Sequence, residues 1–286
     1  MEERLFSVFD TDIMRNADVY TGGYGAEYGG RISSIMDITT RDGNQKRLAG
    51  KISATTFGAK ALIEGPIKKA KETGGGSSTF ILSAKSSYID RSSEALYNNL
   101  DEDGLPYNFT DLYGKISLNG DNGSKINFFG FNFKDEVDYP SLAKIDWNSV
   151  GFGSNFVLIP ARSQVLMEGI FAYSKYETGI DENDFAGGLT DRNSAISGFN
   201  MGLNFTSFKG ANEAKYGFEI NGFNTDFSFI NQQSIEIKQE ENTTEIAGYF
   251  TYTINKGKFV IEPGLRLHYF ASLSEMSPEP RLGLKY

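Results

Sequence analysis

The side chains that usually carry catalysis or bind metals are scarce in this chain. His268 is its only histidine, and there is no cysteine. Ser/His/Asp catalysis would depend on His268 alone, and no nucleophile elbow accompanies it. A metal site needs several ligands, so we interpret His268 as a hydrogen-bonded residue in the wall of the fold. The sequence therefore predicts no enzyme, no metal site and no cofactor.

Two acidic clusters, at residues 101–103 and 181–184, lie in stretches without strand periodicity. Grouped carboxylates could form a calcium site or attract cationic ligands, whereas a solvated acidic loop is the simpler interpretation. Aromatic residues accompany the first cluster, and they suit sugars, catechol-like iron carriers or ordinary loop packing. The candidate ligand-loop residues are Tyr97, Asp101, Asp103 and Tyr107.

A glycine-rich run occupies residues 19–43 and then becomes a strand. Its glycines let a backbone turn sharply and pack closely against a wall. A phosphate-binding loop is the competing interpretation. It fits poorly, because no Gly-Lys-Ser/Thr is present and no helix follows to supply a dipole.

The elements that must position these residues alternate between short and long connections. The short ones are at residues 119–123, 160–162, 209–212 and 255–257, and the long polar ones are at 89–109, 135–144, 177–191 and 226–243. A sheet in which every second connection is long has two unlike ends. Outer-membrane β-barrels have this shape, with tight periplasmic turns and long external loops.

Period-two alternation supports this interpretation. Near the C-terminus, Phe259, Ile261, Leu265 and Leu267 share one face and Arg266 lies on the other. The apolar faces run for about the 9–11 residues that cross a bilayer at a tilt. A soluble sandwich or β-rich binding module would turn its apolar face inward, on strands of usually about 5–6 residues.

We predict about twelve strands between residue 46 and the end of the chain. They begin near Arg47, Gly58, Ser78, Asn108, Ser124, Ala143, Arg162, Asp191, Ala214, Thr244, Lys258 and Pro278. The fold class expected is all-β, an antiparallel transmembrane β-barrel. Because no closing strand follows the last one, we expect this to be part of a larger barrel.

Composition narrows the alternatives. The net charge is −9 and no basic patch is evident, so nucleic acid is not an expected partner. Mean hydropathy is −0.36, and no apolar run approaches the roughly 20 residues of a membrane helix. The 32 glycines and 14% aromatic residues favour long strands with aromatic girdles. The N-terminus does not resemble a signal peptide.

The glycine-rich run resembles the C-terminal end of the plug domain of TonB-dependent outer-membrane receptors. Stretches 64–67, 80–90, 111–115 and 127–131 resemble the start of the barrel, especially in Bacteroidetes-type members. The resemblance implies a plug remnant at residues 1–43 and the first part of a barrel at 44–286. Its plug motif comprises Gly22, Gly23, Tyr24, Glu27, Tyr28, Gly29, Gly30, Arg31 and Asp37.

What this resemblance implies is an energy-coupled receptor in the outer membrane of a Gram-negative bacterium. Such a receptor has a plugged barrel of about 22 strands. It would import a scarce, bulky ligand such as an iron-siderophore, cobalamin or an oligosaccharide. Its partners would be outer-membrane lipid and the periplasmic TonB protein, which binds an N-terminal segment. The resemblance does not decide whether a surface lipoprotein caps the barrel as a lid. The alternative to an energy-coupled receptor is a passive porin-like or structural barrel.

Charges suggest how a plug would be held. Arg31 and Arg41 flank the plug strand, and glutamates are expected on the lumen faces of the barrel: Glu64, Glu168, Glu219, Glu245 and Glu262. Pairs between plug arginines and barrel glutamates would be polar and reversible in a wet lumen. The alternative is that the lumen charges are only solvated.

Overall fold

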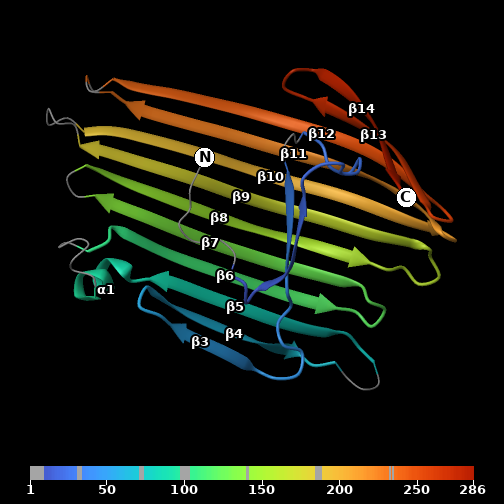
Figure 1. The fold of residues 1–286 in the computed structure, drawn as a ribbon, viewed down its shortest axis with the longest axis horizontal. Coiled ribbons are helices and arrows are strands. Elements are labelled where there is room, and N and C mark those ends of the chain that lie inside the picture. The colour runs from blue at the N-terminus through green and yellow to red at the C-terminus, as the bar shows by residue number, and fades with distance from the viewer. Residues whose placement is uncertain are drawn as a thin grey trace.

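The structure is a computed structural model, and it describes residues 10–30, 34–70, 74–96, 104–139, 142–183, 189–231, 233 and 235–286. Twelve strands form one antiparallel sheet, β3 to β14, in which each strand pairs with the next along the chain (Figure 1). This confirms the predicted all-β class and the predicted number of barrel strands.

Most strands are much longer than the 5–6 residues usual in globular proteins. Those of the large sheet are β3 (Ala49–Ala54), β4 (Gly58–Lys68), β5 (Ser77–Ser87), β6 (Tyr107–Asn119), β7 (Lys125–Tyr139), β8 (Ala143–Leu158), β9 (Val165–Asn183), β10 (Leu189–Lys209), β11 (Asn212–Ile230), β12 (Glu236–Lys256), β13 (Phe259–Phe270) and β14 (Glu275–Lys285).

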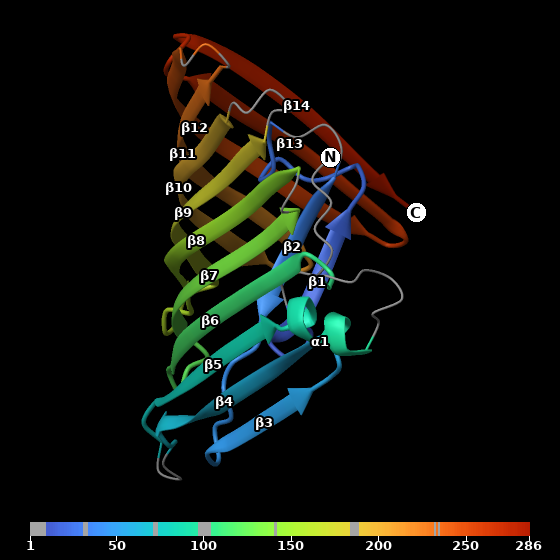
Figure 2. The same ribbon diagram turned by 90° about the vertical axis from the view of Figure 1, so that its left-hand side faces the viewer.

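A second, two-stranded sheet precedes the large one. β1 (Met14–Tyr20) pairs antiparallel with β2 (Ile35–Thr40). The large sheet curves like an open half-pipe, and β1 and β2 lie on its concave side (Figure 2). The strand predicted toward the end of the glycine-rich run is β2, whereas β1 is not among the predicted strands.

The two faces of the large sheet differ as the alternation predicts. In β13, Leu265 and Leu267 are each 45% exposed on the convex face, whereas Arg266 and His268 on the concave face are 1% and 2% exposed. The same split continues through β12, where Phe250 is exposed and Tyr249 is buried. The apolar face therefore points outward, which is the opposite of a soluble sandwich.

The short turns have the backbone expected at tight hairpins. Gly123, Gly210 and Gly257 all have positive φ, between 64° and 85°. This conformation is easy for glycine and strained for most other residues. Arg162 adopts it as well, in the turn between β8 and β9.

The long polar stretches required correction. Residues 177–191 and 226–243 are largely strand. β9 and β10 stay paired as far as Asn183 opposite Leu189, and β11 and β12 as far as Ile230 opposite Glu236. Most side chains there are polar, apart from a few such as Phe227 and Phe229 in β11, while the backbone ladder continues. The expected loop at 135–144 is likewise mostly strand, in β7 and β8.

The stretch predicted as a loop at 89–109 contains a short helix, α1 (Ile89–Leu96). The Ser87 hydroxyl accepts the Ile89 N–H at 3.2 Å, and Asp90 lies in the first turn, where a negative charge is favourable. None of the helices in the described part of the chain has the length and hydropathy of a membrane span.

Candidate functional site: the segment inside the sheet

Residues 10–30 and 34–42, here called the inner segment, contact both ends of the large sheet from its concave side. Ile13 packs with Leu62, Ile81 and Tyr113 in a small buried cluster on the β4–β6 side. At the other end, β13 and β14 supply arginines to the same segment. The segment is therefore held from two directions by the wall around it.

Two carboxylates at the start of the inner segment meet lysines of the wall. Asp12 lies 2.9 Å from Lys51 Nζ and 2.5 Å from Lys60 Nζ. Lys60 also lies 2.9 Å from Asp10. Hydrogen bonds from Lys60 and Lys51 lower the pKa of Asp12 below its ordinary value. This end of the segment is fixed by charge-assisted bonds.

Asp42, at the end of the inner segment, is the most strongly held carboxylate. It lies 2.6 Å from Lys125 Nζ and 3.2 Å from Lys115 Nζ, and Ser117 donates a hydrogen bond to it at 2.9 Å. Burial opposes ionisation of Asp42, but Lys125, Lys115 and Ser117 outweigh it, so its pKa is lowered. Lys115 also donates to the Thr40 carbonyl at 2.8 Å.

The residue after Asp42 requires glycine for a steric reason. A Cβ at Gly43 would overlap the backbone carbonyl of Phe80 in β5. Backbone atoms cannot move aside as a side chain end can. The chain therefore leaves the inner segment in direct contact with the wall.

One predicted ion pair between the inner segment and the wall is present. The Arg41 guanidinium binds Glu64 with both nitrogens, at 2.5 and 3.2 Å. Arg31 lies outside the described residues. Three other predicted glutamates contact residues of the wall itself. Glu219 pairs with Arg266, Glu245 lies 3.4 Å from His268, and Glu262 accepts a hydrogen bond from Thr253.

The polarity of most segment–wall contacts is the reverse of the prediction. The wall supplies the cations, and the inner segment supplies carboxylates and backbone carbonyls. Sequence reasoning missed Lys60, Lys115, Lys125, Arg266 and Arg281. Their signal was available, because each is a cation on the concave face of a strand.

The glycine-rich loop is held through its backbone. Arg266, which is 1% exposed, donates to the Glu27 carbonyl at 3.0 Å and to Glu219 at 2.9 Å. Arg281 donates to the carbonyls of Tyr24, at 3.3 Å, and Gly25. Backbone carbonyls offer the same bonds whatever the side chain, so these arginines recognise the path of the loop.

Several plug-motif residues have a definite structural role. A side chain at Gly29 would overlap the guanidinium of Arg266, while Gly23 and Gly30 have positive φ of 66° and 65°. A Cβ added at Gly22 would meet no other atom within 4 Å, and Asp37 is exposed in β2. Close packing against a wall, as predicted for the run, is therefore explicit at Gly29.

Three tyrosines of the motif region form a small aromatic group. The Tyr28 ring lies 5.6 Å from that of Tyr20 and 6.5 Å from that of Tyr24. Burial, with the nearby Tyr20 and Asp37, raises the pKa of Tyr28 to about 12. Tyr28 is therefore a neutral hydrogen-bonding group near neutral pH.

Of the four candidate ligand-loop residues, only Tyr107 is among the described residues. Tyr97, Asp101 and Asp103 lie outside the described residues. Tyr107 begins β6, and its hydroxyl lies 3.1 Å from that of Tyr139 in β7. In the second acidic cluster, Glu182 pairs with Arg192 at 3.2 Å. The described part of the chain holds no group of three metal-ligating side chains.

His268 lies in the wall, as interpreted from the sequence, but the hydrogen bond expected of it is not found among the described residues. Its Nε2 is 3.4 Å from Glu245, its Nδ1 is 3.7 Å from Glu279, and its ring stacks on Phe270 at 4.2 Å. Among the described residues, neither ring nitrogen makes a hydrogen bond. A Cβ at Gly30 would lie 3.7 Å from the imidazole, so His268 adjoins the inner segment.

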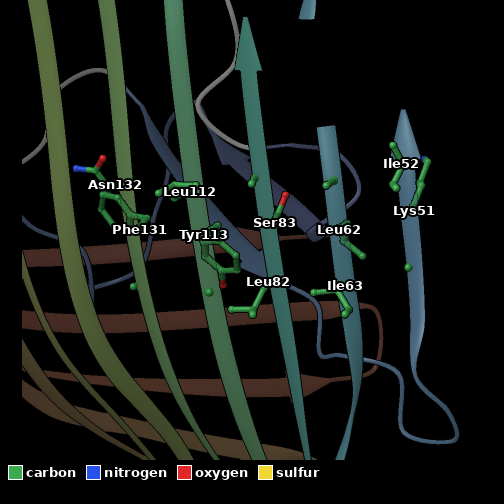
Figure 3. Close-up of a pocket in the computed structure, with 15 residues that line it drawn as sticks. Lys51, Ile52, Leu62, Ile63, Leu82, Ser83, Leu112, Tyr113, Phe131 and Asn132 are labelled. Carbon is green, nitrogen blue, oxygen red and sulfur yellow. The ribbon is translucent and has the colours of Figure 1, made fainter. Parts of the chain in front are cut away.

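A large apolar hollow of about 990 Å³ lies on β3–β7, and its lining includes Leu62 and Tyr113 (Figure 3). Its exposed side chains include Ile52, Ile63, Leu82 and Leu112 on the convex face. The depression forms because small residues such as Gly114 lie between these larger side chains. An outward apolar surface of this kind suits lipid rather than a polar solute.

No protein-family profile and no curated protein matches the chain. Solved structures share its fold, at identities that show the fold alone. The outer membrane transporter YddB from Escherichia coli aligns over 96% of this chain and 45% of its own, with a TM-score of 0.60 and 11% identity. The alcaligin outer membrane receptor FauA from Bordetella pertussis aligns over 96% of this chain and 46% of its own, with a TM-score of 0.65 and 10% identity.

The hemophore receptor HasR from Serratia marcescens, solved with the hemophore HasA and heme, aligns over 96% of this chain and 47% of its own, with a TM-score of 0.63 and 11% identity. The chain thus spans about half the length of these structures. Over that half, the chain shares the fold of outer-membrane transporters and receptors.

Proposed function

We propose that this chain comprises the end of the plug and the first part of the barrel of a TonB-dependent receptor in the outer membrane of a Gram-negative bacterium. The observation that carries the proposal is the inner segment, which wall cations hold on the concave, polar face of an outward-apolar sheet. A passive pore has no need of such an occupant. In this proposal residues up to 43 are the end of the plug, and the strands from Ala49 onward are the barrel wall.

The proposed activity is energy-coupled import of a scarce, bulky solute. Supporting it, the fold is that of an outer membrane transporter, an alcaligin receptor and a hemophore receptor. The contacts of the inner segment suit a reversible seal. When the segment moves, water can replace the partners of its ion pairs and arginine–carbonyl bonds. Exposing a large apolar interface to water would cost much more free energy.

The proposed ligand classes are iron-siderophores, heme-like or cobalamin cofactors, and oligosaccharides. Outer-membrane lipid and the periplasmic energy-transducing protein are the proposed partners. The Bacteroidetes-type assignment and a surface lipoprotein lid stay predictions from the sequence resemblance. A passive barrel is the second candidate, and the experiment below separates the two.

The test is a disulfide that fixes the inner segment to the wall. A Cβ at Gly264 in β13 would lie 3.2 Å from the Ala26 Cβ, close to the spacing of disulfide-bonded Cβ atoms. Because the chain has no cysteine, the double variant Ala26→Cys/Gly264→Cys forms a single defined cross-link. It is expressed from the native gene in its own host.

We expect energy-dependent uptake of a radiolabelled siderophore, cobalamin or oligosaccharide to stop in the oxidised double variant and to return with dithiothreitol. Each single-cysteine variant serves as the matched control and transports normally under both conditions. Uptake that continues through the oxidised, fully cross-linked protein, or that survives collapse of the proton gradient, would contradict a moving plug and favour a passive barrel.

A further inference from the structure

The convex face of the sheet changes character sharply at one row of aromatic residues. The pairing register places Phe152, Tyr173 and Phe199 directly opposite one another on β8, β9 and β10. The rings of Phe152 and Tyr173 are 5.6 Å apart. On the short-turn side of this row, the same face carries apolar side chains such as Met201 and Phe218. Aromatic girdles of this kind mark the edge of the lipid-facing band.

Beyond the aromatic row, the same face becomes polar over three consecutive rows. Residues directly opposite each other in a sheet share a face. The rows across β8, β9, β10 and β11 are Val150–Lys175–Ser197–Asn224, Asn148–Glu177–Ala195–Asp226 and Asp146–Gly179–Asn193–Ser228. Glu177, Gly179, Asp226 and Ser228 of these rows lie in stretches that the sequence predicts as polar loops.

These rows surround a hollow of about 790 Å³, within the usual range for ligand pockets. Gly179 forms its floor, because a Cβ there would lie 2.6 Å from the Asp146 carboxylate and 3.4 Å from the Asn193 amide. The hollow is on the convex face, so a solute inside the half-pipe does not reach it. Tyr173 links it to the aromatic row.

The lining chemistry favours hydroxyl-rich ligands. Asn148, Asn193 and Asn224 present amides from three strands, and an amide can both donate and accept. The Asn224 amide nitrogen donates to Glu240 at 3.0 Å and to Asn242 at 2.9 Å, so both of its hydrogens are used. Lys134 and Lys175 also line the hollow, and Lys175 is paired with Glu177. Amides, carboxylates and one aromatic ring suit sugar hydroxyls better than phosphate.

We propose that this hollow binds the saccharide headgroup of an outer-leaflet glycolipid. Its place just beyond the aromatic row puts it at headgroup height, and it opens sideways toward the surrounding lipid. The inference rests on the membrane location proposed above. It does not depend on transport, so the two proposals can fail separately.

The experiment uses the full chain in vesicles of phosphatidylethanolamine and phosphatidylglycerol, with lipopolysaccharide as the probe and its acid-released core oligosaccharide as the soluble comparison. Gly179→Val fills the floor of the hollow with a strand-favouring side chain. Gly248→Val is the matched control, since the nearest atom to a Cβ there is 3.9 Å away. Asn193→Ala tests the polar lining.

We expect lipopolysaccharide to bind the wild type and Gly248→Val equally, and to bind Gly179→Val and Asn193→Ala at least about tenfold more weakly. Circular dichroism checks that all variants keep their β content. Equal binding to all four proteins, or none to the wild type, would overturn the proposal. Oligosaccharide binding as tight as that of lipopolysaccharide would overturn the lipid source and identify a free glycan as the ligand.

Discussion

At the scale of single residues, charge decides how the inner segment is held. Asp12 and Asp42 meet lysines, whereas Arg266 and Arg281 meet backbone carbonyls. Both kinds of bond are charge-assisted and roughly twice as strong as neutral hydrogen bonds. Because the wall provides nearly all of the cations, single substitutions on either side test the attachment.

Asp42→Asn should loosen the end of the inner segment. It removes the charge that Lys115 and Lys125 share, and Lys115 is left with its side chain only 5% exposed. The expected loss is about 1.5–3 kcal/mol of local stability. Hydrogen exchange of the amides in β2 measures it, with the exposed Asp37→Asn as a control that should change little.

The pH dependence of this contact follows from the lowered pKa of Asp42. A carboxylate with a lower pKa in the folded state stabilises it above the unfolded value, here 3.8, and loses that contribution as pH falls through the folded value. Wild type and Asp42→Asn should therefore differ near neutral pH and converge in acid. A difference that does not shrink as the pH falls below 3.8 would contradict this assignment.

Arg266→Gln should release the glycine-rich loop while leaving β1 and β2 paired. The variant loses the bond to the Glu27 carbonyl and the ion pair to Glu219. We expect amides of residues 24–29 to exchange about tenfold to a hundredfold faster, from a loss of about 1.5–3 kcal/mol. Arg192→Gln, on the same face but paired with Glu182, should leave that loop unchanged.

At the scale of elements, the junction between β2 and β3 fixes the inner segment to the wall. Gly43→Val would place a side chain on the Phe80 carbonyl, and backbone cannot yield without disturbing β5. We expect protease to cut between the inner segment and the wall in this variant, while the strands from β6 onward stay protected. Gly22→Val, where the space is open, is the control and should resist protease like the wild type.

The strands themselves extend past the region that the alternation reveals. β10 and β12 each span 21 residues, about twice the length that crosses a bilayer at a tilt. Their outer parts are mostly polar and are held by the neighbouring backbone. Polar composition alone therefore predicted loops in stretches where pairing with the neighbouring strand keeps the backbone extended.

At the scale of the whole molecule, the sheet separates an apolar convex face from a polar concave one. Met201→Lys places a charge on the convex face, and Asn200→Lys places it beside Glu219 on the concave face. Since Met201 lies between the aromatic row and the middle of the apolar band, we expect the first to cost about 1–3 kcal/mol in a bilayer and the second much less. Denaturant unfolding from phosphatidylcholine vesicles compares them, and equal costs would mean that the convex face does not contact lipid.

The sequence determined the strand count, the direction of the apolar face and the wall position of His268. These follow from local periodicity, which is written residue by residue. Only the tertiary structure decided which charges meet. Asp42 and Lys125 are 83 residues apart in sequence, and Glu27 and Arg266 are 239 apart. Such pairs depend on how the sheet curves around the inner segment, and no local pattern encodes that curvature.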